Sequence, residues 1–113
     1  MAIIDDIGKE KDAAVAVLEK KIGDALDLKN AGEAGMDPII HDLMTKRVAV
    51  FLQAYTGALE SEEMQKALTA LKAATADMSR VAAEMKKAAE FIAKAAKLLG
   101  GADKAIAALQ GKA

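Results

Sequence analysis

The chain has 113 residues, 53% of them hydrophobic and only 3% aromatic, which suits one domain with an aliphatic core between helices and disfavours extensive disorder. It contains no Cys, so disulfide staples, thiolate catalysis and cysteine metal sites are excluded. The formal net charge of −1 and the pI near 5.8 lack the basic bias of a DNA-binding domain.

Residues 3 to about 28 predict a first helix, because large apolar side chains recur every three or four residues. Asp5 and Asp6 stand near its start, where carboxylates interact favourably with the helix dipole. Segment 30–36 contains one Asn and two glycines. It predicts the main interhelix loop of a single helical-bundle domain over residues 1–113.

A second helix is expected over residues 38–59, with Asp37 as its N-cap and Pro38 as its first helical residue. Its apolar residues cover much of the circumference, which is typical of a central helix that is packed on two sides. Only a short break precedes Ser61, the N-cap expected for the next helix. The second and third helices are therefore predicted to pack antiparallel.

Residues 62–99 contain neither Gly nor Pro and carry an unbroken heptad, which predicts one helix of about 37 residues, roughly 55 Å long. The large residues of this heptad are Met64, Leu71, Met78, Met85, Ile92 and Leu99. A kink near Asp77 is the alternative to a straight helix. Gly100 and Gly101 are expected to end the helix, and residues 102–110 to form a short fourth helix that either docks or frays.

These elements predict an all-α antiparallel bundle of three main helices, about 3–28, 38–59 and 62–99, with a short C-terminal helix at about 102–110. The third helix would exceed its neighbours by up to ~20 Å and would expose an apolar patch at its distal end. Either the C-terminal segment or a second chain would cover that patch. The candidate partner-binding residues are therefore Met85, Lys86, Lys87, Phe91, Ile92, Lys94, Leu98 and Leu99.

Charge is unevenly distributed along the chain. Residues 1–45 carry ten acidic and five basic residues, whereas residues 84–113 carry three acidic and six basic residues. The simpler interpretation places an acidic first helix beside a basic last helix within the fold. The alternative is an acidic partner for the C-terminal half of the chain.

No residue is assigned a catalytic, cofactor-binding or metal-binding role, and the sequence predicts no enzyme. His41 is the only histidine, and neither a nucleophile motif nor a helix-borne metal motif accompanies it. Asp37, His41 and Asp42 share one expected helix start, which does not make a convincing metal site. The lysines of the C-terminal half are not interleaved with aromatic residues, so nucleic acid is not expected as a partner.

The leading functional hypothesis is a non-enzymatic interaction or structural protein that binds a protein partner, or itself as a homodimer, through the distal half of the third helix. The alternative is an amphipathic protein of a membrane, lipid or granule surface. The Ala-rich composition is similar to that of phasins, which coat polyester granules, and no motif extends this likeness.

A cytoplasmic location is expected, because the N-terminal residues lack the pattern of a signal peptide. The longest uncharged run has twelve residues, from Val48 to Leu59, which is too short to span a bilayer. Export by a non-classical route is left open.

Overall fold

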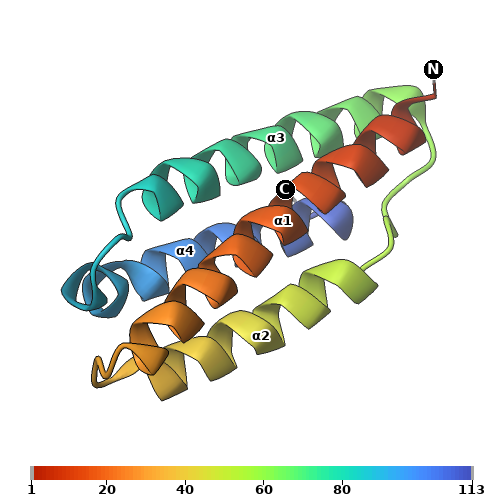
Figure 1. Cartoon of the computed structure of the whole chain (residues 1–113). Helices are drawn as coiled ribbons and strands as arrows, with labels where there is room; N and C mark the ends of the chain where they lie inside the picture. The colour runs from red at the N-terminus through yellow and green to blue at the C-terminus, as the bar shows by residue number, and fades with distance from the viewer. Residues whose placement is uncertain (1, 113) are drawn as a thin grey trace.

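The computed structural model describes residues 2–112 and confirms the all-α fold (Figure 1). The described residues form the helices α1 (Ile3–Asn30), α2 (Met36–Leu52), α3 (Ser61–Ala83) and α4 (Ala88–Leu109). The bundle measures 50 × 22 × 21 Å along its principal axes. The expected first helix corresponds to α1, and the loop expected near residues 30–36 is the turn that precedes α2.

The helices are arranged as two antiparallel hairpins, α1–α2 and α3–α4, that pack against each other (Figure 1). α1 packs on α2 and α3, α4 packs on α3 and α2, and α1 and α4 meet in a smaller contact. α1 runs parallel to α3, and α2 runs parallel to α4. Within residues 2–112, α2 and α3 make no contact, so the expected pairing of the second and third helices is wrong. The reason is the connector 53–60, which crosses the end of the bundle instead of forming a tight turn.

The second helix ends at Leu52 rather than near residue 59, because the following connector binds the end of α4. The backbone N–H of Thr56 donates to the carbonyl of Leu109 at 2.8 Å, which satisfies one of the last carbonyls of α4. Gly57 and Gly111 are in backbone contact, and a Cβ on Gly57 would lie 3.0 Å from the Cα of Gly111. A helical continuation of α2 would lose these contacts.

The prediction of one helix over residues 62–99 is wrong, because the chain turns back at residues 84–87 between α3 and α4. No kink occurs at Asp77, which lies inside α3. The heptad column faces the interior as far as Met85, which is fully buried. After the turn the pattern fails, since Ile92 is 60% exposed.

Hydrogen bonds from side chains to the backbone help to hold the turn between α3 and α4. The Glu90 carboxylate accepts from the backbone N–H groups of Lys86, at 3.0 Å, and Lys87, at 2.9 Å. The carbonyl of Met85 accepts from the ammonium of Lys21, on α1, at 2.9 Å. These bonds satisfy backbone groups that a continuous helix would have paired internally.

The expected helix end at Gly100 and Gly101 is also wrong, because α4 continues through both glycines to Leu109. Gly101 is buried, and a Cβ there would lie 2.7 Å from Cγ of Met78. Glycine therefore allows α4 to approach α3 closely at this level. The segment expected as a separate fourth helix, residues 102–110, is the docked second half of α4 rather than a frayed tail.

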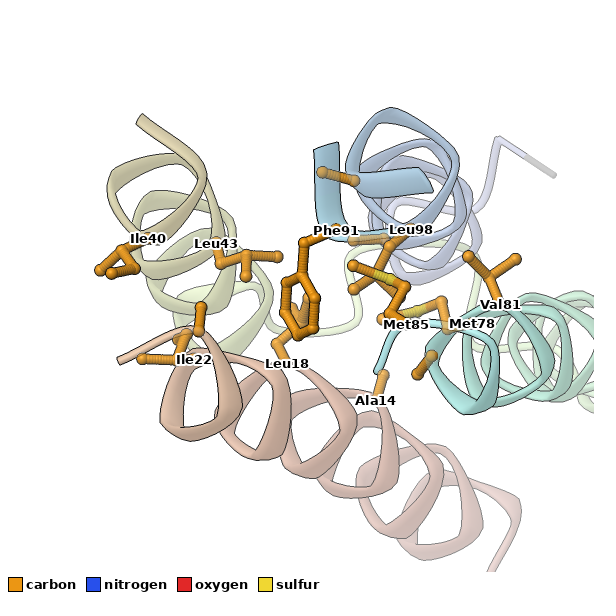
Figure 2. Packing of buried hydrophobic residues seen from close by; sticks show 14 of the residues in the cluster. Ala14, Leu18, Ile22, Ile40, Leu43, Met78, Val81, Met85, Phe91 and Leu98 are labelled. Atoms are coloured by element: carbon orange, nitrogen blue, oxygen red, sulfur yellow. The ribbon is translucent and has the colours of Figure 1, made fainter. Parts of the chain in front are cut away.

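The core consists of two clusters of buried side chains. In the larger cluster, the ring of Phe91 from α4 lies among Leu18 of α1, Leu43 of α2 and Met85 of the α3–α4 turn (Figure 2). The smaller cluster lies at the other end of the bundle and joins the start of α1 to the end of α4. Its members are Ile7, Leu68, Leu71, Ala74, Ala105, Ala108 and Leu109.

Candidate interaction surfaces

The apolar residues predicted to bind a partner lie mostly in the core. Met85, Phe91 and Leu98 are fully buried, and Leu99 is partly buried against the larger cluster (Figure 2). Only Ile92 is exposed, and it covers Gly35 of the α1–α2 turn, where an added Cβ would lie 3.3 Å from its Cδ1. The expectation of an exposed apolar patch at the end of a long helix is therefore wrong.

The three lysines of the predicted site lie near the surface around the α3–α4 turn. Lys86 and Lys87 are exposed, whereas the ammonium of Lys94 is 2.5 Å from the Glu84 carboxylate. The hydrogen bond from Lys94, together with its charge, holds the pKa of Glu84 below its ordinary value. Lys94 is thus paired within the chain, while Lys86 and Lys87 extend from the turn.

The exposed apolar surface lies elsewhere, on the α1–α2 hairpin. Of the eight large apolar side chains that are exposed within residues 2–112, all but Ile92 belong to α1, α2 or the connector that follows α2. Phe51 is 54% exposed and Leu52 is 72% exposed. We define the α1–α2 face by the six residues on the two helices: Ile4, Leu26, Met44, Val48, Phe51 and Leu52.

Contacts between the two helices place Met44 and Phe51 of this face at their seam. The guanidinium of Arg47 on α2 is 3.4 Å from the carboxylate of Glu19 on α1. Both residues line a hollow of about 230 Å³ together with Ile22 and Met44. Nearer the end of α2, the Lys11 ammonium donates to the carbonyl of Phe51 at 3.2 Å.

Helical periodicity assigns further residues of α1 to the same flank as Glu19. Asp12 and Asp5 precede Glu19 at intervals of seven residues, so the three carboxylates form an acidic column beside the apolar residues. Gly23 follows one turn after Glu19, and no atom lies within 4 Å of a Cβ added to it. This flank of α1 is therefore acidic, and at Gly23 no bulky side chain covers it.

The sequence carries a signal for the α1–α2 face. The broad apolar surface of α2 predicted contacts on two sides of that helix. In the structure, Leu43 and Val50 are buried by neighbouring helices, whereas Met44, Val48 and Phe51 remain exposed.

The residues considered for chemistry do not form a joint site. His41 is exposed, with its Nδ1 3.6 Å from a carboxylate oxygen of its neighbour Asp42. The hydroxyl of Tyr55 donates to the carbonyl of Ala58 at 2.6 Å, which serves the fold of the connector. Within the described chain, no three His, Cys, Asp or Glu side chains gather in a way that could hold a metal ion.

As the charge distribution led us to expect, the acidic first helix lies beside the last helix, since α1 contacts α4, although no ion pair joins the two helices in residues 2–112. In residues 2–112 the interhelix ion pairs of α2 join Arg47 to Glu19 of α1, Asp37 to Lys29 of α1, and Lys46 to Asp103 of α4.

In the part of the chain that the structure describes, no helix combines the length and the apolar character needed to cross a membrane. Comparison with protein-family models, with curated proteins and with solved structures finds no match.

Proposed function

We propose that this chain is a non-enzymatic interaction protein that binds an amphipathic helix of a partner protein along the α1–α2 face. The observation that carries the proposal is the concentration of exposed large apolar side chains on this face. Soluble monomers rarely leave such a group uncovered unless it contacts a partner. The predicted site on the distal half of the third helix is not retained, because use of Met85, Phe91 and Leu98 would require the core to open.

The dimensions of the α1–α2 face suit a helix. Ile4 and Leu26 are separated by 22 residues of α1, which corresponds to ~33 Å, or about six helical turns. On α2, Met44, Val48 and Phe51 follow the spacing of residues on one helical face. Helix-in-groove recognition uses apolar anchors at this spacing.

Charge favours a partner helix with basic residues along one flank. The acidic column of Asp5, Asp12 and Glu19 borders the apolar residues, and only Glu19 has an ion pair with α2. A second copy docked through the same face would bring two acidic columns into one interface. An anionic lipid surface would be repelled by the same carboxylates. A cytoplasmic location fits this proposal and is still a prediction.

The test uses two synthetic 22-residue amphipathic helices, one with Leu and Lys and one with Leu and Glu, and fluorescence anisotropy as the readout. We expect the Leu–Lys peptide to bind more tightly. The double variant Val48→Ser/Phe51→Ser should weaken its binding at least tenfold. The matched control is Ile92→Ser, which removes an exposed apolar residue outside the face.

Equal binding by the double variant and the parent chain, or an equal loss in the Ile92→Ser control, would refute the proposed face. Sedimentation equilibrium and vesicle flotation test the other occupants. If the protein forms a dimer and Val48→Ser/Phe51→Ser abolishes it, the occupant of the face is a second copy of the chain rather than a partner helix. If the protein floats with vesicles and the same variant does not, the occupant of the face is a lipid surface.

A further inference from the structure

A second surface lies on the other flank of α1, where that helix faces α3 and the α3–α4 turn. Two adjoining hollows, of about 540 Å³ and about 230 Å³, share Lys20, Lys21 and Ala83 in their linings. Lys86 lines the larger hollow and Ser79 lines the smaller one. We call this surface the lysine groove; its apolar lining consists of Val17, Ala82, Ala83 and Met85.

Lys21 fixes the floor of the lysine groove. The residue is only 6% exposed, and its ammonium donates to the Met85 carbonyl at 2.9 Å and lies 3.0 Å from the Asp24 carboxylate. The same ammonium lies 5.6 Å from the centroid of the Phe91 ring. A buried lysine with these partners ties α1 to the turn, so Lys20 and Lys86 extend from backbone that is held in place.

The charges of the groove are not balanced. Among the described residues, neither the Lys20 side chain nor the Lys86 side chain forms an ion pair. Asp24 is the one carboxylate in the lining, and it forms an ion pair with Lys21.

The acidic residues near the turn are also engaged. Glu84 contacts Lys94 and Arg80, and Glu90 accepts from two backbone N–H groups. The lysine groove therefore holds two cations, Lys20 and Lys86, that form no ion pair among the described residues, with Ser79 and an apolar wall in the same lining.

We propose that the lysine groove binds an organic phosphate, with the phosphate between Lys20 and Lys86 and the apolar part of the ligand on Val17 and Ala82. Lysine binds phosphate as a point charge, and the Ser79 hydroxyl in the smaller hollow can donate a hydrogen bond to another part of the ligand. The larger hollow falls within the usual range of about 300–1,000 Å³ for small-molecule sites. The ligand can be a soluble organic phosphate or the headgroup of a phospholipid, since both offer the same chemistry.

The test is a titration of the full-length ¹⁵N-labelled protein with phenyl phosphate and with pyrophosphate, followed by NMR. We expect saturable shifts confined to amides near residues 17–24 and 79–87. The binding free energy, divided by the charge of the ligand, should be more favourable for phenyl phosphate than for pyrophosphate. The variant Lys20→Gln/Lys86→Gln should weaken binding at least tenfold. The matched control Lys97→Gln/Lys104→Gln removes two exposed lysines elsewhere and should change binding less than twofold.

Flotation with phosphatidate-containing vesicles distinguishes the two sources of phosphate. Vesicle binding that depends on Lys20 and Lys86 assigns a lipid headgroup, and binding of the soluble phosphates alone assigns a soluble ligand. Shifts that do not saturate, or an equal loss of binding in the Lys97→Gln/Lys104→Gln control, would overturn the proposal. This surface is separate from the α1–α2 face, so Val48→Ser/Phe51→Ser should leave phosphate binding intact.

Discussion

The ammonium of Lys21 is the most deeply buried charge in the described chain, and its hydrogen bond to the Met85 carbonyl links α1 to the turn that precedes α4. Replacement by Met keeps most of the apolar stem and removes the donor. A buried carbonyl left without its partner costs about 1–3 kcal/mol, so we expect Lys21→Met to lower the free energy of unfolding by that amount. Urea denaturation measures the change.

The neighbouring substitution Lys20→Met serves as the control for Lys21→Met. Lys20 is exposed, and changes at such positions usually stay within about 0.5 kcal/mol. If the two variants unfold at the same urea concentration, the bond from Lys21 does not stabilise the fold.

The Glu90 carboxylate has a pKa below its ordinary value of 4.5, because it accepts hydrogen bonds from the backbone N–H groups of Lys87 and Lys86. A carboxyl whose pKa is lower in the folded state stabilises the fold above its unfolded pKa, and this contribution is lost as pH falls through the folded pKa. We therefore expect the melting temperature to fall between pH 5 and pH 3, and to fall less in Glu90→Gln. Circular dichroism melts over this pH range measure the fall in melting temperature, with Glu33→Gln as the control.

At the scale of the helix, the adjacent glycines of α4 have opposite surroundings. An Ala at Gly100 meets nothing within 4 Å, so Gly100→Ala should stabilise the protein by about 1 kcal/mol through helix propensity. An Ala at Gly101 would place its Cβ 2.7 Å from Cγ of the buried Met78. Overpacking usually costs about 1–3 kcal/mol, so Gly101→Ala should destabilise. Urea denaturation of both variants checks the difference in sign, and equal shifts would contradict it.

The sequence predicted the helices that carry a regular local signal and failed where tertiary contacts decide. α1 has one apolar face and an Asn–Gly-rich end, and both features were interpreted correctly. The turn at residues 84–87 consists of Glu, Met and Lys, which favour helix, so no local signal marks it. It forms because Met85 is buried and its carbonyl is bound by Lys21, which lies 64 residues away in sequence.

The candidate surfaces were hidden from sequence reasoning for a related reason. The turn shifts the buried positions of α4 by one residue from the heptad, so Phe91 and Leu98 enter the core in place of Ile92 and Leu99. Which half of the broad apolar surface of α2 remains open depends on where α1 and α4 pack. Neither fact is contained in the periodicity of a single segment.

At the scale of the whole molecule, Leu109 joins the two hairpins through the smaller core cluster. Leu109→Ala should lower the free energy of unfolding by about 2–5 kcal/mol, as is usual for a buried leucine. It should also speed hydrogen exchange of the Thr56 amide, which donates to the Leu109 carbonyl. Leu59→Ala is the control, because that leucine is 80% exposed on the connector. A similar loss of unfolding free energy in both variants would show that the smaller core cluster does not hold the two hairpins together.

The connector 53–60 has a consequence for assembly. Each hairpin closes through a short turn, whereas the chain passes from one hairpin to the other through this connector across the end of the bundle. If the connector opened, the second hairpin of one molecule could occupy the same place on the first hairpin of another. Such a domain-swapped dimer would reproduce every contact between hairpins twice and would need no new interface except at the connectors themselves.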